Sequence, residues 1–173
     1  MRIGPMASLL LGCSLFAADY SSLIESPNAS TIIQKDLLAP AKTYTMPADC
    51  ISTDPKVIAR GAFMFHNLNG DTKDTPPEGL SKTNSNGSVK QFGNCVACHN
   101  IEGAKGAGNI GPDLHEFKKN FIDTGVRNDQ FVYQKIADAR IDNPVTHMTI
   151  NLTSGLFNQR EICDIASYIV SPK

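Results

Sequence analysis

The chain has 173 residues and a formal net charge of −1, and 41% of its residues are hydrophobic. This length suits one domain of ordinary size with extensions. Sixteen lysines and arginines are balanced by seventeen acidic residues without any basic run, which excludes the electrostatic footprint of a nucleic-acid-binding protein. After the first segment, no apolar stretch reaches the roughly 18 residues that a membrane-spanning helix needs.

Residues 1–18 are typical of a secretory signal peptide. A positive residue is followed by an apolar run to Phe16 and by the small residues Ala17 and Ala18, where we expect cleavage. The alternative is lipoprotein processing, because the sequence LLGC ends at Cys13 and would leave a lipid on that sulfur. Both interpretations predict export, and we expect the protein in the periplasm.

The exported chain divides into an N-terminal extension, residues 19–52, and a main domain, residues 53–173. Apolar residues between 32 and 38 indicate one small helix in the extension, before prolines interrupt the pattern. From Pro55 onward, apolar side chains recur at helical spacing and predict the first helix of the main domain. They are Val57, Ile58, Gly61, Ala62 and Phe65.

A long polar segment, residues 66–91, follows this helix. Gly, Asn, Thr, Ser, Lys and Pro dominate it, so we predict a loop rather than a packed element. Loops of this length inside a compact domain are usually functional or disordered.

Three further helical segments are predicted after residue 110. The first rests on apolar spacing alone, and the second has Asn128 as its N-cap. The third begins with a capping box of Asn158 and Glu161 and stops at Pro172. Alternating runs of strand length are scarce, so we predict an all-α fold of short helices joined by long loops. The apolar positions of the three segments are Leu114, Phe117 and Phe121, then Phe131, Val132 and Ile136, then Ile162, Ile165, Ala166 and Ile169.

Residues 93–100, GNCVACHN, contain the attachment sequence of a c-type haem, Cys-x-x-Cys-His. Residues i and i+3 lie on one side of a helical turn, so Cys95 and Cys98 can bond to the two vinyl groups of one porphyrin. His99 then lies under the ring, where an imidazole nitrogen reaches the iron. We therefore predict one covalently bound haem c.

Three other interpretations of these motifs are less favourable. A structural zinc site needs a second closely spaced ligand pair, and the remaining cysteines are far apart. A thioredoxin-like redox pair needs a βαβ context. Residues 106–111 read GAGNIG, but no predicted strand precedes this GxGxxG and Pro112 follows it at once, which argues against a dinucleotide site.

The segment after the haem motif is expected to orient His99. A metal-bound histidine usually donates its other ring N–H to a carbonyl or carboxylate. We predict that the Pro112 carbonyl accepts this N–H and that Gly111 permits the close approach.

The iron also needs a ligand on its opposite face. The candidates are Met64, His66, His115, His147 and Met148. We choose Met148, in the polar loop 140–151, because a methionine paired with histidine raises the reduction potential into the electron-transfer range. We expect His66 to be solvated, and His115 follows the Gly-Pro segment too closely to reach the opposite face.

Several stretches together resemble class I cytochromes c, and more closely the SoxX family, the small monohaem subunits of the thiosulfate-oxidising SoxAX complex. In class I cytochromes c the first and last helices cross, and Gly61 and Phe65 match that contact with Ile165 and Tyr168. The stretches that carry the resemblance are IARGAFMF, GNCVACHNI, GNIGPDL and NPVTHMTINLTSGLFNQREICDIASYIV.

The resemblance implies a class I cytochrome c fold with an N-terminal extension and a long loop insertion. It also implies electron transfer in a periplasmic heterodimer with a SoxA-type haem subunit, where thiosulfate is coupled oxidatively to the SoxYZ carrier. This chain would pass electrons to a downstream acceptor cytochrome. The sequence offers no catalytic nucleophile of its own, and the extension and the insertion are hypothesised to wrap the partner subunit.

Two other functions are kept as alternatives. A free soluble shuttle cytochrome would carry the same haem without a fixed partner. An enzyme or gas sensor would leave the sixth iron position open.

Cys50 and Cys163 remain after the haem motif and the signal are set aside. In an oxidising compartment, we predict a disulfide that ties the extension to the last helix. A free Cys163 beside the buried stripe is the alternative.

Overall fold

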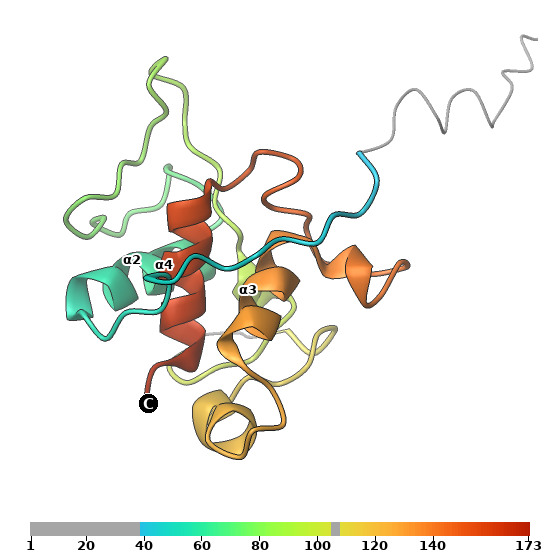
Figure 1. Cartoon of the computed structure of the whole chain (residues 1–173). Coiled ribbons are helices and arrows are strands. Elements are labelled where there is room, and N and C mark those ends of the chain that lie inside the picture. Colours follow the sequence, from blue (N-terminus) through green and yellow to red (C-terminus); the bar gives the residue numbers. More distant parts are fainter. Residues whose placement is uncertain (1–38, 105–107) are drawn as a thin grey trace, which may run out of the picture. The chain divides into compact units, whose positions relative to one another are not determined.

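The computed structural model describes residues 39–104 and 108–173. Its α-helices are α2 (Pro55–His66), α3 (Asp129–Ala137) and α4 (Gln159–Val170), joined by loops (Figure 1). Short turns η1 (Cys95–Ala97) and η3 (Ala139–Ile141) are 3₁₀-helical, and η2 (Lys118–Ile122) is π-helical. The described residues contain only two isolated β-bridges and no strand, which confirms the predicted all-α class.

Helix α2 begins and ends through local hydrogen bonds. The Asp54 side chain accepts from the Lys56 N–H and Pro55 occupies the first turn, where its missing N–H costs nothing. At the other end, the backbone N–H and the side-chain amide of Asn67 both donate to the Phe63 carbonyl. The helix therefore stops at the start of the long polar segment.

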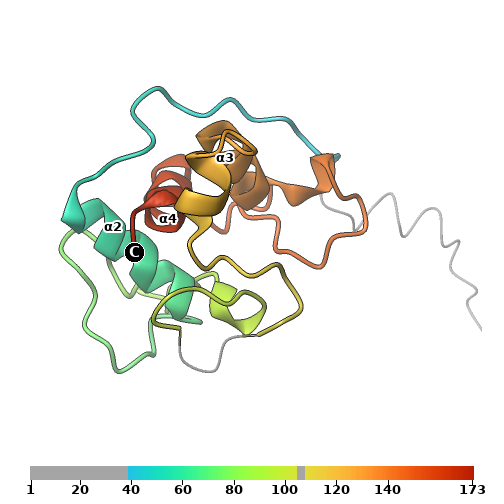
Figure 2. The ribbon, with the colours of Figure 1, turned by 90° about the horizontal axis from the view of Figure 1, so that it is seen from below.

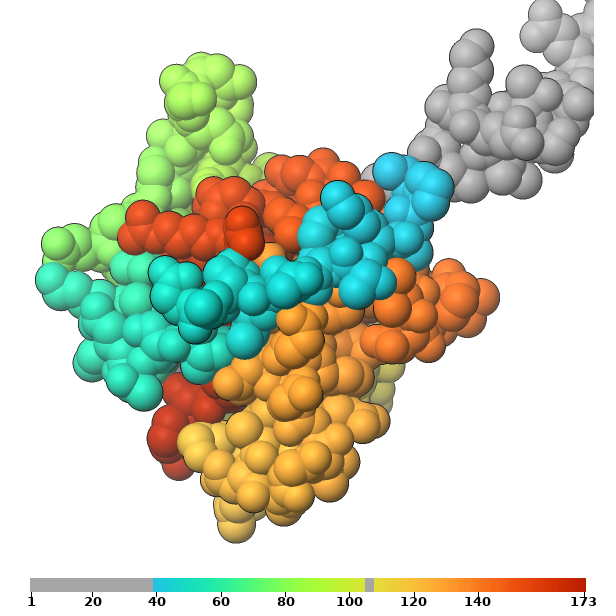
Figure 3. All heavy atoms as spheres, viewed as in Figure 1, coloured from blue at the N-terminus to red at the C-terminus, as the bar shows by residue number. Residues whose placement is uncertain are grey.

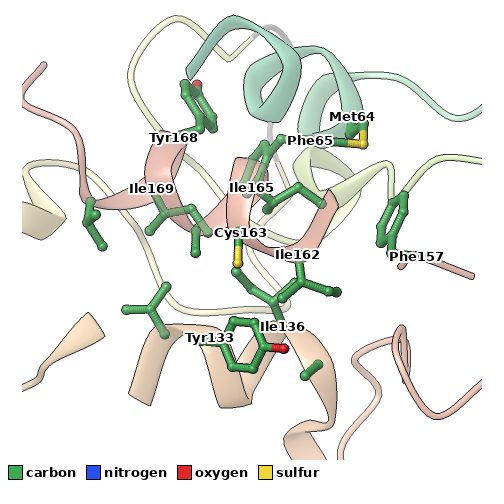
Figure 4. Packing of buried hydrophobic residues seen from close by; sticks show 14 of the residues in the cluster. Met64, Phe65, Tyr133, Ile136, Phe157, Ile162, Cys163, Ile165, Tyr168 and Ile169 are labelled. Atoms are coloured by element: carbon green, nitrogen blue, oxygen red, sulfur yellow. The ribbon is translucent and has the colours of Figure 1, made fainter. Parts of the chain in front are cut away.

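Helix α4 has the capping box that the sequence predicts. The Asn158 side chain accepts from the Glu161 N–H, and the Glu161 carboxylate accepts from the Asn158 N–H, both at 3.0 Å. Its apolar stripe is buried throughout, with Ile162, Ile165 and Ala166 at 1% exposure or less. The helix is thus the centre of the core (Figure 4).

Helices α2 and α4 cross in close contact, as predicted for residues 61, 65, 165 and 168. A Cβ added to Gly61 would lie 2.0 Å from the Asp164 carbonyl oxygen, so only glycine fits there. The rings of Phe65 and Tyr168 pack edge to face with centroids 5.5 Å apart. Arg60 closes the crossing with a buried ion pair, its Nε 2.7 Å from Asp164 Oδ2.

Helix α3 covers another side of α4. Asn128 accepts from the Phe131 N–H as the N-cap, as the sequence predicts. Tyr133 and Ile136 are almost completely buried and lie against the α4 stripe, on the side away from Phe65 (Figure 4). The core is therefore built from three short helices, with α4 between the other two.

Residues 67–91 form a loop beyond the end of α2, as predicted, except that His66 belongs to the helix. Two isolated bridges, Asn69 with Gln91 and Thr83 with Val89, fold it back on itself (Figure 1). An ion pair between Lys90 and Glu161 ties its return arm to the first turn of α4.

The described end of the extension forms a strap, residues 39–50, that runs along α3 (Figures 2 and 3). The Tyr44 and Met46 N–H groups donate to side-chain oxygens of Gln134 and Gln130 at 2.7 and 2.8 Å. The strap ends in a disulfide between Cys50 and Cys163, whose Cα atoms are 4.9 Å apart. The predicted bridge is confirmed, and residues 39–50 pack against their own domain.

Asp138, the residue after α3, has a fully buried side chain. Its carboxylate accepts from Arg140 and Thr153 side chains and from the Lys42 N–H, and the hydrogen bonds from Arg140 do most to lower its pKa from 3.8 to about 2. A depressed pKa means that the folded state binds this proton less readily than the unfolded state. The carboxylate therefore stabilises the fold above about pH 4, and this contribution is lost as the pH falls towards 2.

This linkage predicts a pH-dependent stability that Asp138→Asn removes in part. Denaturant unfolding should show a lower free energy of unfolding at about pH 3 than at about pH 5 in the wild type. The variant should be less stable at pH 5 and should show a smaller difference between the two conditions. An equal difference in both proteins would contradict the assignment.

No helix among the described residues is long and apolar enough to cross a membrane. Three predictions fall wholly or partly outside these residues: the signal peptide with Cys13, the small helix at 32–38, and the start of the GAGNIG stretch.

Candidate haem site

A cavity of about 400 Å³ opens beside the core, within the range of about 300–1,000 Å³ that is usual for ligand pockets. Apolar side chains form most of its wall, and they come from α2, α3, α4 and the segment just before η2. Among them are Phe65, Leu114, Phe117, Phe131, Val132, Ile136, Ile165 and Ile169. The wall therefore suits a large, mostly apolar group.

Cys95 and Cys98, the two free cysteines among the described residues, line this cavity from η1 and the residue that follows it. The Cys98 and His99 N–H groups both donate to the Cys95 carbonyl, at 3.1 and 2.8 Å, so the motif forms a tight single turn. Asn94 precedes it with a φ of 43°, the left-handed conformation that turns the chain into the motif. Burial raises the pKa of the Cys95 thiol to about 12, so this sulfur is neutral until it is bonded.

His99 lines the same cavity and is held by the segment predicted to orient it. Its Nδ1 lies 2.8 Å from the Pro112 carbonyl oxygen. Since a carbonyl oxygen can only accept, Nδ1 carries the proton and Nε2 keeps its lone pair. The predicted hydrogen bond is present, and it leaves His99 with a nitrogen that is able to ligate a metal.

Gly111 is required for this arrangement. A Cβ at residue 111 would lie 2.4 Å from His99 Cε1 and 2.6 Å from its Nδ1. The Gly111 N–H donates to the Cys98 carbonyl at 2.8 Å, which fixes the backbone beside the ring. Even one methyl group would therefore displace either the imidazole or the Pro112 carbonyl.

Gly111→Ala should accordingly disturb the haem itself. We expect a changed visible spectrum and a loss of roughly 1–3 kcal/mol of unfolding free energy, because the ring has to move against packed backbone. Gly125→Ala is the matched control, since it adds a methyl group in open space at a φ of 73°. That control can lower stability through backbone strain, but it should leave the haem spectrum unchanged. A wild-type spectrum and stability in Gly111→Ala would contradict this prediction.

The structure separates the five candidates for the opposite face. Met148 and His147 line the cavity, with Met148 half-buried and His147 exposed. Met64 has no exposed surface and belongs to the core. His115 is an exposed partner of Asp113, with Nδ1 and Oδ1 2.6 Å apart.

The expectation that His66 is solvated is wrong. His66 is the last residue of α2, and its Nε2 lies 2.8 Å from the Tyr168 hydroxyl. The partial burial lowers its pKa, with the charge of Lys173 adding to the effect. The sequence pattern predicted His66 as part of the loop because polar residues follow it at once. In the structure, the crossing of α2 and α4 covers its side chain.

Asn151 is a cavity residue that the sequence did not single out. Its side chain is 2% exposed, and Nδ2 donates to the Ile136 carbonyl at 2.7 Å. Its Oδ1 is buried and has no hydrogen-bond partner within the described part of the chain. A polar residue in a loop sequence gives no signal of burial, so only the fold could reveal it.

These residues fit a haem. The apolar wall, the two thiols, a histidine with a free Nε2 and a methionine surround one cavity. The unpartnered Asn151 oxygen is consistent with a cavity that takes up a further group. Zinc is not favoured, since the described residues contain no cluster of three or more His, Cys, Asp or Glu side chains that could hold a metal ion.

The family model described as Cytochrome c matches residues 85–173, which include the Cys pair, Pro112, Met148 and α4. No curated protein matches the chain significantly.

Proposed function

Because this chain belongs to the cytochrome c family, we propose that it is an exported electron-transfer protein with a single haem, held by Cys95, Cys98, His99 and Met148. Family membership implies a covalently bound haem c and electron transfer. The observation that carries the assignment of residues is their position around one cavity, with His99 fixed by Pro112 in the tautomer that ligates metals.

Each residue has a distinct role in this proposal. Cys95 and Cys98 supply the two thioether bonds, which retain the group even where the protein does not enclose it. His99 would supply Nε2 to the iron while Pro112 holds its other nitrogen, and Met148 would supply its thioether as the second protein ligand. When bound, the haem supplies a one-electron couple, and a histidine–methionine pair raises its potential.

The apolar wall has its own part in electron transfer. A low-dielectric surrounding disfavours the extra positive charge of the oxidised iron, and the protein sets the potential through this burial and through the axial ligands. Phe65, Ile165 and Ile169 exclude water on the side of the crossed helices. These residues are fixed in the core, so the surroundings of the site need to rearrange little between oxidised and reduced states.

The haem assignment is tested by expressing the full chain with a haem-maturation system in the periplasm. The product should be red, should bind one haem per chain by mass, and should keep it after denaturation. Replacing both Cys95 and Cys98 with alanine should abolish this retention. A colourless wild-type product would overturn the proposal.

We further propose that the chain is the small subunit of a SoxAX complex in the periplasm. The stretches GNIGPDL and NPVTHM support this assignment, as does the extension beyond a minimal haem domain. The disulfide agrees with an oxidising compartment. The partners would be a SoxA-type haem subunit, the SoxYZ carrier and a downstream acceptor cytochrome, with the thiosulfate chemistry on the SoxA-type partner.

Co-expression with a SoxA-type chain tests the finer proposal. Affinity purification of either chain should recover both in equal amounts, and the pair should reduce an acceptor cytochrome when given thiosulfate and SoxYZ. A chain that remains monomeric and transfers electrons freely would instead be a soluble shuttle. Carbon monoxide binding to the ferrous wild type at neutral pH would favour a sensor or enzyme with an open iron position.

A further inference from the structure

The loop that carries Met148 is clasped at both of its ends by the strap. We use the name Met148 loop for residues 138–153, between the end of α3 and the approach to α4. We propose that the strap positions the Met148 loop at the cavity, with Tyr44 and Thr153 as positioning residues for the iron's sixth ligand. This inference rests on the proposed function and deepens it.

The strap reaches the two ends of the loop separately. At the first end, the Lys42 N–H donates to Asp138 Oδ2 at 3.3 Å. At the second end, the Tyr44 hydroxyl lies 2.9 Å from Thr153 Oγ1. Two residues of the strap that are only two positions apart therefore contact both ends of a sixteen-residue loop, with residue numbers 138 to 153.

The direction of the hydrogen bonds joins these contacts into one chain. Thr153 Oγ1 lies 2.8 Å from Asp138 Oδ2, and a carboxylate only accepts, so the single hydroxyl hydrogen of Thr153 goes to Asp138. The Tyr44 hydroxyl must then donate to Thr153. The hydrogen bonds therefore run in one direction, from Tyr44 of the strap to Thr153 at the end of the loop and on to Asp138 at its start.

Asp138 accepts the last of these hydrogen bonds, and its side chain is held in a fixed orientation. Its carboxylate is fully buried, and Arg140 donates to both of its oxygens, through Nε at 2.9 Å and Nη2 at 2.8 Å. The bidentate ion pair fixes the orientation of Oδ2, the oxygen that accepts from both Lys42 and Thr153. The Asp138 carboxylate stays ionised at neutral pH, since its pKa is about 2.

The strap is itself fixed along its length. Gln134 accepts from the Tyr44 N–H and donates to the Lys42 carbonyl, at 2.7 and 3.1 Å. Gln130 holds Met46 and Tyr44 in the same way, at 2.8 and 2.9 Å. The disulfide of Cys50 then anchors its end to α4. The strap is thus tied to α3 and α4, two of the three described α-helices whose side chains line the cavity.

Residues 143–149 of the loop lack such anchors, and the last tie before them is the ion pair of Asp142 with Lys135 of α3 at 2.7 Å. In the described structure, the hydrogen bonds of residues 143–149 stay inside the loop, for example from the Met148 N–H to Thr146 Oγ1 at 3.1 Å. Residues 141–145 are exposed. The position of Met148 therefore depends on how the ends of the loop are held, which Tyr44 and Thr153 help to decide.

The experiment uses the full-length haem protein and its variants Tyr44→Phe and Thr153→Val, which remove one hydroxyl each and keep the side-chain shape. Two readouts report the iron–sulfur bond: the near-infrared charge-transfer band of the oxidised protein, and the rate at which carbon monoxide binds to the reduced protein. Carbon monoxide can bind only after the thioether leaves. We expect about fivefold faster binding in each variant, because each loses one hydrogen bond that stabilises the state with Met148 bound to the iron.

The double variant tests whether the two hydroxyls act in series. Removing either hydroxyl interrupts the same series of hydrogen bonds. The double variant should therefore bind carbon monoxide little faster than the faster single variant. Tyr168→Phe is the matched control, because it also loses one phenol hydroxyl, which is hydrogen-bonded to His66 at 2.8 Å and not to the Met148 loop. Its carbon monoxide rate should equal that of the wild type even if its unfolding free energy falls.

The possible failures are distinguishable. A wild type without the near-infrared band would overturn Met148 as the ligand, and this inference with it. A wild type that has the band, together with strap variants that bind carbon monoxide at the wild-type rate, would overturn the inference alone. An equal acceleration in Tyr168→Phe would also overturn it, because the effect would then follow general stability.

Discussion

Replacing Met148 with alanine is expected to leave the haem attached and to open its sixth coordination position. The thioether bonds of Cys95 and Cys98 do not depend on Met148, which lies in a separate loop on the cavity wall. The oxidised variant should lose the sulfur-to-iron band, and the reduced variant should bind carbon monoxide stoichiometrically. Its reduction potential should fall by on the order of a few hundred millivolts, within the roughly 0.8 V span that axial ligands set.

His147→Ala is the matched control for this variant. His147 is the neighbour of Met148, lines the same cavity and is exposed. Its removal should leave the band, the carbon monoxide response and the potential close to those of the wild type. If instead the His147 variant binds carbon monoxide and the Met148 variant does not, the axial ligand is the imidazole.

The second large effect concerns the disulfide. Cys50 and Cys163 are 113 positions apart, so their bond closes a long loop of the unfolded chain. In the chain-entropy account, a loop of this length contributes about 5 kcal/mol to the free energy of unfolding. Replacing both cysteines with alanine should lower the melting temperature by roughly 10–20 °C for a protein of this size.

The measurement is thermal and denaturant unfolding of the haem-loaded protein, with and without a reductant. Reductant should destabilise the wild type and leave the double variant unchanged, because only the wild type has the bond. The single variants Cys50→Ala and Cys163→Ala should resemble the double variant. A wild type whose unfolding is insensitive to complete reduction would show that the packing of the strap is sufficient without the bond.

The disulfide shows which part of the structure can be predicted from the sequence and which part cannot. Two unassigned cysteines in a chain expected to be exported were enough to predict the pair, because the partner choice was reduced to one. Its consequence was not predictable: the bond ends a strap that packs on α3 of the same chain and contacts both ends of the Met148 loop. Those contacts join residues about 100 positions apart, and sequence spacing carries no information about them.

The helices were predictable where their signals are local. The Asn158–Glu161 capping box, the Asn128 cap and the apolar stripe of α4 act within one or two turns, and each is present in the structure. His66 was misplaced because its burial comes from α4, about 100 residues further along the chain. Asn151 was missed for the same reason, since a long-range fold buries it and turns its amide towards Ile136.

The sequence by itself determined the chemistry of the site, because Cys-x-x-Cys-His and the Gly111-Pro112 segment lie within twenty residues and act through nearest-neighbour geometry. It also determined the all-α class, through caps and apolar spacing. Only the tertiary structure decided which of five distant side chains line the cavity, and it retained His147 and Met148. That choice depends on how α2, α3, α4 and the strap pack together, since packing brings a loop to a cavity through contacts between segments that are remote in the chain.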